Sequence, residues 1–136
     1  MYINGFKWVD SNGTSRLSRV IFTTAVADAP ARALLLERMQ FNADYGCDFC
    51  LHMGENVEKG LGHVQVFPLR LPLPCLRIHE SILEHANLVA QYGIPVMGIK
   101  GPSLLGGLQG FDLAKGLISD SMHCLWLGIV VQLMWD

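Results

Sequence analysis

Two short apolar runs, each followed closely by an aspartate, most constrain the fold of this chain. Residues 20–26 are apolar and mostly β-branched with little alternation, which is typical of a strand buried on both faces. This run ends near Asp28, and a second, shorter run at residues 117–119 ends at Asp120. We expect a helix after each aspartate. Strands that alternate with helices predict an α/β domain with a mixed sheet and flanking helices.

Three helices are expected. Residues 76–92 carry apolar side chains at three- and four-residue spacing and are followed by Gly93, which predicts an amphipathic helix. Pro30 suits the first turn of a helix, and residues 31–41 are rich in good helix formers. A third, mostly apolar helix is expected from Met122 onward. The residues expected on the buried side of the 31–41 helix are Leu34, Leu35 and Met39.

The other elements are predicted as short strands and turns. Residues 2–9 are typical of a strand that runs into a tight turn at residues 10–13, because Asn-Gly tolerates the positive φ that such turns need. The partner strand is expected at residues 19–27. Two further short strands are expected at residues 45–52 and 63–67, and a proline-rich, extended connector follows.

Length and composition indicate one domain with an incomplete surface. The chain has 136 residues, which suffice for one hydrophobic core but not for two. Hydrophobic residues make up 51% and charged residues 16%, whereas typical soluble chains carry about 25% charge. A partner surface would explain this shortage of ions. The net charge of -2 gives no support for nucleic-acid binding by itself, since phosphate contacts need clustered cations.

No targeting or membrane segment is visible. The N-terminal residues lack a basic run followed by an apolar stretch, so a nuclear or cytoplasmic location is expected. The longest apolar stretch, residues 125–135, is interrupted by Gly128 and Gln132 and is far shorter than the roughly 20 residues that span a bilayer. It is interpreted as a core helix, and no membrane contact is expected.

Asp28 and Asp120 are the first candidate site. Strand ends are where α/β folds place ligands, and hard Mg²⁺ or Mn²⁺ prefers carboxylate oxygens. Two such carboxylates suit metal-assisted phosphoryl transfer, in which two ions lie about 3.5–4 Å apart. The alternative is structural: Asp28 would cap the helix that follows it, and Asp120 would cap the last helix.

Cys47 and Cys50 are the second candidate site. Two thiolates in a Cys-x-x-Cys motif can hold one tetrahedral Zn²⁺, but they form only half of its ligand set. The alternatives are two buried free thiols or a thioredoxin-like redox pair, for which the motif should open a helix. The candidates for the remaining zinc ligands are His52, His123, Cys124, His63 and Cys75.

Asp120 and His123 are three residues apart and would share one side of a first helical turn. One metal ion or one polar network could use both side chains. The alternative is a capping aspartate next to an unrelated histidine.

Five separated motifs occur in order over nearly the whole chain. They are Val26–Arg32, Tyr45–His52, Arg77–Glu80, Gly98–Ser103 and Asp120–Cys124. Taken together they resemble the transposase-derived proteins of the CACTA (En/Spm) group. The resemblance implies an RNase H-like fold and a catalytic set of Asp, Asp and a late Glu or Asp.

Carried over by motif, the resemblance implies that Asp28 is the first catalytic acid and Asp120 the second, with His123 the histidine that follows it. Cys47 and Cys50 match the cysteine pair of that family. Two departures are visible. The residue after His52 is methionine where proline is expected, and the residue after Asp120 is serine where an aromatic side chain is expected.

The resemblance therefore implies that residues 1–136 form an incomplete RNase H-like domain of the DDE/D transposase type, with the third acid beyond residue 136. The intact enzyme would use two Mg²⁺ or Mn²⁺ ions on DNA at transposon ends, and the chain as given would be inactive. The alternative is a non-catalytic, zinc-stabilised transposon remnant or domesticated interaction module, which could self-associate or dock on another protein.

Overall fold

The computed structural model describes residues 5–122 of the chain. The expected helix after Met122, together with His123, Cys124 and Asp136, lies outside the described residues. The elements in chain order are β1 (Phe6–Val9), β2 (Ser15–Ser18), β3 (Ala25–Ala27), α1 (Ala29–Leu35), β4 (Glu55–Lys59), β5 (Gly62–Val66), α2 (His79–Tyr92), a 3₁₀ turn (Leu104–Gly107) and β6 (Leu117–Ser119). Helices and strands mix, as the predicted α/β class requires. Within this range the strands form three separate two-stranded sheets, two antiparallel and one parallel, instead of the single mixed sheet that was expected.

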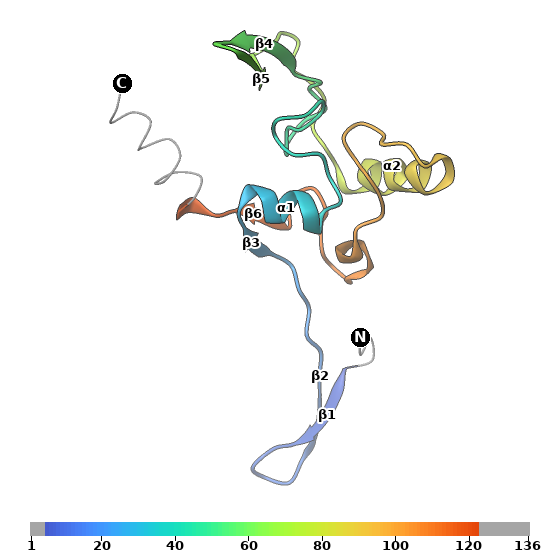
Figure 1. Ribbon diagram of the computed structural model, residues 1–136. Helices are drawn as coiled ribbons and strands as arrows, with labels where there is room; N and C mark the ends of the chain where they lie inside the picture. The colour runs from blue at the N-terminus through green and yellow to red at the C-terminus, as the bar shows by residue number, and fades with distance from the viewer. Residues whose placement is uncertain (1–4, 123–136) are drawn as a thin grey trace.

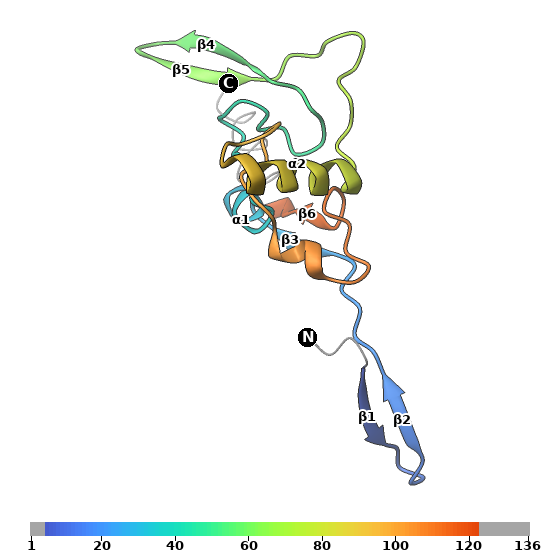
Figure 2. The ribbon, with the colours of Figure 1, turned by 90° about the vertical axis from the view of Figure 1, so that its right-hand side faces the viewer.

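β1 and β2 form an antiparallel hairpin that projects from the body of the molecule (Figures 1 and 2). The turn is organised by Asp10, whose Oδ1 accepts hydrogen bonds from the backbone N–H groups of Asn12 and Thr14 at 3.0 and 2.9 Å. The predicted turn is confirmed. The predicted partner strand at residues 19–27 is wrong, because this turn lets pairing begin at Ser15 and end at Ser18, opposite Phe6.

The apolar run at residues 20–26 is not a strand buried on both faces. Val20, Ile21 and Phe22 are 71%, 62% and 56% exposed and lie in the extended connection between the hairpin and the body. Only Ala25–Ala27 pair as a strand. Apolar, β-branched composition favours an extended backbone, but burial requires packing partners, and the described residues leave most of these side chains exposed.

β3 and β6 pair in parallel over three residues, from Ala25 opposite Leu117 to Ala27 opposite Ser119. The pair is extended at one end by the Ala25 N–H, which donates to the Gly116 carbonyl at 2.8 Å. The predicted strand at residues 117–119 is confirmed. This pairing joins two segments that are far apart in the sequence.

Helix α1 begins directly after β3 with Asp28 as its N-cap and Pro30 in its first turn, as predicted. It ends at Leu35 instead of residue 41, because Glu37 adopts a positive φ of 50° that turns the chain away. The predicted buried side is also wrong. Leu34 and Leu35 are 67% and 45% exposed, and the buried residues are Arg32, Ala33 and Leu36.

Residues 45–52 form a loop, where a strand was expected. Their β-sheet pairing is limited to one bridge, between Cys50 and Leu76. The strands of this region are β4 and β5, which form a second hairpin at the opposite end of the molecule from β1 and β2 (Figure 1). The expected strand at residues 63–67 corresponds to β5.

Helix α2 confirms the predicted amphipathic helix and contributes Ile82, Ala86 and Val89 to the core. Its C-cap is Gly93, with a left-handed φ of 73°. The buried face of α2 packs with side chains from the segment that leads into β6. The core residues are Leu36, Ile82, Ala86, Val89, Ile99, Phe111, Leu113 and Leu117.

Candidate functional site

Asp28 and Asp120 lie at the same edge of the β3–β6 pair. Ala27 and Ser119 are the last paired residues, and each aspartate is the next residue along its strand. The Asp120 backbone N–H donates to the Ala27 carbonyl at 3.1 Å, which holds the two strand ends together. β3 and β6 lie side by side next to α1 in both views (Figures 1 and 2). Two residues far apart in the sequence are thus brought together.

Both aspartates also cap the backbone that follows them. Asp28 Oδ1 accepts from the Ala31 N–H at 2.8 Å, and Asp120 Oδ1 accepts from the Met122 N–H at 2.9 Å. The capping role expected for Asp28 is therefore confirmed. It is compatible with metal binding, since an ionised carboxylate has two oxygens and about four acceptor sites.

The donor set at this edge suits a hard divalent cation. Carboxylate oxygens are the ligands that Mg²⁺ and Mn²⁺ prefer, and Mg²⁺ is commonly held by one or two carboxylates and several waters. Across residues 5–122, no three His, Cys, Asp or Glu side chains gather closely enough to hold one ion together. The two aspartates thus fit part of a hard-metal centre.

Cys47 and Cys50 also come together, in the loop of residues 45–52. Their Sγ atoms are 3.3 Å apart, with the Cys50 thiol donating to Cys47. Burial and this donated hydrogen bond raise the pKa of the Cys50 thiol. Two thiolates on a tetrahedral Zn²⁺ would be about 3.8 Å apart, so a small adjustment would accommodate the ion. The motif opens no helix, which disfavours the thioredoxin-like alternative.

His52 is buried and both of its ring nitrogens are engaged. Nδ1 accepts from the Gly54 N–H at 2.8 Å, so the proton is on Nε2, which donates to the Pro68 carbonyl at 3.1 Å. The ring also meets Phe67 edge-on. A zinc ion on His52 would have to displace one of these hydrogen bonds. As placed, His52 braces the loop against the segment after β5.

Two of the other proposed zinc ligands lie apart from the cysteine pair. Cys75 lies opposite Leu51 in the backbone pairing, and Cys50 opposes Leu76, so Cys75 and Cys50 point to opposite faces. His63 lies on β5, within the β4–β5 hairpin. His123, which was also expected to share a metal or a polar network with Asp120, is outside the described residues.

Three buried arginines, which no sequence pattern predicted, contact the cysteine loop. Arg32, Arg38 and Arg77 are only 7%, 3% and 4% exposed. Arg32 forms a 2.7 Å ion pair with the Asp48 carboxylate, between the two cysteines. The one carboxylate between the two cysteines was the available signal, because an acid that loses much of its contact with water needs a cationic partner. Its three basic neighbours are spread along the sequence.

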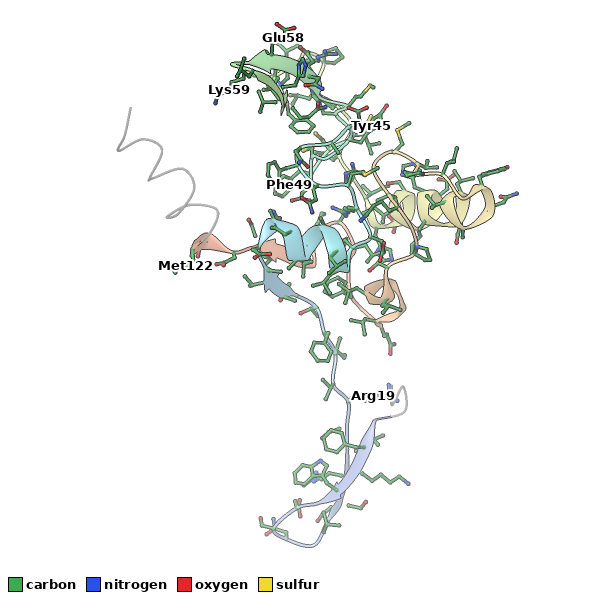
Figure 3. The ribbon with its side chains drawn as sticks, viewed as in Figure 1. Arg19, Tyr45, Phe49, Glu58, Lys59 and Met122 are labelled. Atoms are coloured by element: carbon green, nitrogen blue, oxygen red, sulfur yellow. The ribbon has the colours of Figure 1, made fainter. Side chains whose placement is uncertain are left out.

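Arg38 and Arg77 bind backbone carbonyls. Arg38 donates to the carbonyls of Asp48 and Leu113 at 3.0 and 2.7 Å. Arg77 donates to three carbonyls, of Tyr45, Cys47 and Met97, at 2.7 to 2.9 Å. The loop is therefore held by guanidinium groups from both sides. In Figure 3, Tyr45 and Phe49 mark this loop, between α1 and the β4–β5 hairpin.

Burial shifts the titration of these arginines without discharging them. Desolvation, helped by the neighbouring Arg77, lowers the pKa of Arg38 to about 10. Desolvation also lowers the pKa of Arg77. Arg38 thus stays a cation at neutral pH, and the carboxylates of Asp48 and Asp112 both stabilise its charge.

An open depression of about 300 Å³ lies near the start of α2, lined by His79, Glu80 and Asp112 among others. Its polar groups serve local structure. His79 Nδ1 accepts from the Leu113 N–H at 3.0 Å, and Asp112 Oδ1 accepts from the N–H groups of Ala114 and Lys115. None of its lining residues belongs to the aspartate or cysteine pair.

Comparisons with family models, curated proteins and solved structures find no match to this chain. The resemblance to the CACTA group therefore stays a prediction that rests on the five motifs. Across residues 5–122, no helix combines the length and apolar character needed to cross a membrane.

Proposed function

We propose that this chain is part of the catalytic core of a metal-dependent DNA transposase with an RNase H-like arrangement, in which Asp28 and Asp120 hold Mg²⁺ or Mn²⁺. The parallel pairing of β3 with β6 carries the proposal, because it sets both aspartates one residue beyond the last strand pair. The motif resemblance is independent support. It names these same two residues as the first and second catalytic acids.

Each aspartate contributes a fixed oxygen ligand. Bound divalent ions would supply charge stabilisation for the attacking and leaving oxygens of a DNA phosphodiester, with water or a 3′-hydroxyl as the nucleophile. The capping hydrogen bonds from Ala31 and Met122 orient the two carboxyl groups. Orientation by such hydrogen bonds increases metal affinity, since ligands that are held in place lose less freedom on binding.

Strand cleavage would also need a third carboxylate. The described residues bring no third acidic side chain to this edge of the sheet. We therefore expect Asp28 and Asp120 to bind Mn²⁺ without efficient cleavage until the third acid is present, as the resemblance implies.

Mn²⁺ titration followed by electron paramagnetic resonance tests the proposal. We expect the unaltered chain to bind Mn²⁺, and Asp28→Asn or Asp120→Asn to lose that binding. Asp10→Asn, a change in the carboxylate of the hairpin turn, is the matched control and should bind normally. A second experiment uses a version of the chain that is extended by downstream coding sequence. We expect this version to nick supercoiled plasmid DNA and its Asp28→Asn variant not to, which would support the proposed catalytic role. Mn²⁺ binding that survives both substitutions would contradict it.

A second candidate function is a non-catalytic module held together by zinc. It is favoured by the two thiols 3.3 Å apart in a loop that buried arginines fix in place. This hypothesis predicts that zinc copurifies with the chain and is lost in Cys47→Ser. Cys75 is exposed, and the Cys75→Ser variant should keep its zinc. Zinc without any Asp28-dependent Mn²⁺ binding would favour this module over the transposase core.

A further inference from the structure

We infer that Asp48, Arg32 and Arg38 form a clamp that positions the two metal-binding aspartates; the inference rests on the proposed function of Asp28 and Asp120. None of the three clamp residues lies at the metal-binding edge. They are positioning residues, which act through the segments that carry the aspartates.

The first half of the clamp holds the segment of Asp28. Arg32 is on α1, and its backbone N–H donates to the Asp28 carbonyl at 2.9 Å. Its guanidinium pairs with Asp48 at 2.7 Å, with side-chain exposures of 9% and 24%. Because Arg32 lies one helical turn from the cap, this ion pair fixes the first turn of α1 against the cysteine loop.

The second half holds the segment of Asp120. Arg38 donates to the Asp48 carbonyl at 3.0 Å and to the Leu113 carbonyl at 2.7 Å, so one guanidinium spans the loop and the approach to β6. The turn after Leu113 is closed by the Gly116 N–H, which donates to the Asp112 carbonyl at 2.6 Å. Three residues of strand then lead to Asp120. Asp48 is thus common to both halves.

The β3–β6 pair needs such support. It contains only three residue pairs, and isolated two-stranded pairing is marginal in water even for antiparallel strands, which pair better than parallel ones. Buried guanidinium groups with fixed partners are well suited to the task, since Arg presents its donors in a rigid plane. Loss of the Asp48 carboxylate would leave Arg32 without its ion-pair partner and would remove one of the two acids, Asp48 and Asp112, that stabilise the charge of Arg38.

The test measures Mn²⁺ affinity in Asp48→Asn at a temperature at which circular dichroism shows the variant to be folded. We expect affinity to fall by about 10-fold or more, the size of effect seen when residues that orient metal ligands are changed. Asp44→Asn is the matched control, because Asp44 is an exposed acid of the neighbouring segment whose carboxylate accepts from the Gln65 side chain at 3.2 Å. It should bind Mn²⁺ normally.

A second control separates positioning from general stability. Ile82 is a core residue of α2, 2% exposed and outside the clamp. Ile82→Val should lower the thermal midpoint without weakening Mn²⁺ binding. If Ile82→Val and Asp48→Asn weaken binding in proportion to their loss of stability, the positioning role is overturned.

Other outcomes are equally decisive. Normal Mn²⁺ affinity in a folded Asp48→Asn variant overturns the clamp and leaves the proposed function standing. Absence of Asp28-dependent Mn²⁺ binding in the unaltered chain overturns both. If Asp48→Asn does not fold, Arg32→Lys replaces it: this variant keeps the charge but shortens the reach, so an affinity between those of the unaltered chain and Asp28→Asn supports the clamp, and an unaltered affinity overturns it.

Discussion

At the scale of single residues, Asp28 combines two tasks that can be separated by substitution. Its Oδ1 atom caps α1 through the Ala31 N–H, while the ionic charge of its carboxylate would serve the metal. Asn caps helices about as well as Asp, but its amide is neutral and a much weaker ligand for Mg²⁺ or Mn²⁺.

We therefore expect Asp28→Asn to keep the free energy of unfolding within about 0.5 kcal/mol of the unaltered chain, whereas Asp28→Ala should lose about 1 kcal/mol. Both variants should lose Mn²⁺ binding. Urea denaturation and Mn²⁺ titration of the same samples measure the two effects. Equal stability of the Ala and Asn variants would show that the cap contributes nothing.

Asp10 makes the N-terminal hairpin sensitive to acid. The Thr14 N–H, then the Arg16 guanidinium, hold the pKa of its carboxyl below the ordinary value of 3.8. A lowered pKa means that the ionised carboxylate stabilises the folded hairpin. This contribution is fully present above about pH 4 and is lost as the pH falls through the lowered pKa.

The indole N–H of Trp8, which donates to Ser18 Oγ at 2.8 Å across the hairpin, reports on this change. Its nuclear magnetic resonance signal should shift toward the unfolded position as the pH falls below 4. In Asp10→Asn the acid dependence of this signal should be absent. A signal with the same acid dependence in both proteins would contradict the role of Asp10.

Arg77 should be among the residues whose loss costs most stability. Replacement by leucine would leave the carbonyls of Tyr45, Cys47 and Met97 without their donor, at about 1–3 kcal/mol for each group that stays buried. We expect a loss of about 3 kcal/mol or more in urea denaturation and faster reaction of Cys47 and Cys50 with a thiol reagent.

Arg70→Leu is the control for that substitution. Arg70 pairs with Glu55 on the exposed β4 strand, with 58% of its own side chain exposed, so its loss should change stability by about 0.5 kcal/mol or less. Similar losses of stability in the two variants would mean that water replaces Arg77 as the hydrogen-bond donor to the three carbonyls.

At the scale of secondary-structure elements, the sequence predicted what local signals determine. The spacing of apolar residues in α2, the Asn-Gly turn after β1 and the cap of α1 each act within a few residues, and all three are confirmed. The apolar stretch at residues 117–119 also forms the expected strand.

The errors concern elements that depend on distant partners. Leu34 and Leu35 were predicted to form the buried face of the helix, but Ala33 and Leu36 are buried instead. The chain turns away at Glu37, which ends the helix early. The cysteine loop looks like a strand, yet arginines from α1, its C-terminal extension and the approach to α2 hold it as an irregular segment.

In the candidate site, too, the features set by local sequence were predicted and those set by distant contacts were not. The sequence pattern placed Asp28 and Asp120 at strand ends, but it did not predict that these two strands pair with each other. The parallel pairing of β3 with β6 depends on contacts between segments that are far apart in the sequence. The clamp could not be predicted, since nothing in the local sequence distinguishes the buried Arg32 and Arg38 from exposed helix arginines.

At the scale of the whole molecule, the connection between the N-terminal hairpin and the body exposes an unusual amount of apolar surface. Val20, Ile21 and Phe22 are each more than half exposed in succession. Exposed apolar patches of this kind mark interaction surfaces or promote association. The low proportion of charged residues points the same way.

We expect the chain to self-associate with increasing concentration and Phe22→Ser to weaken that association. Leu61→Ser, at the fully exposed tip of the β4–β5 hairpin, is the control and should have a smaller effect, because Leu61 is flanked by Gly60 and Gly62 and not by a run of apolar side chains. Sedimentation velocity at several concentrations measures both. A monomer at all concentrations would show that this surface is tolerated in water.

The parallel pairing of β3 with β6 also sets an order of events during folding. It closes a loop that contains α1, α2 and the β4–β5 hairpin. Contacts between residues this distant in sequence form slowly, because the entropic cost of closing the loop comes before the favourable contact energy. During synthesis, Ser119 must have emerged from the ribosome before the strand pair can be completed. The edge that carries both aspartates is thus assembled only after nearly all of the described chain has been synthesised.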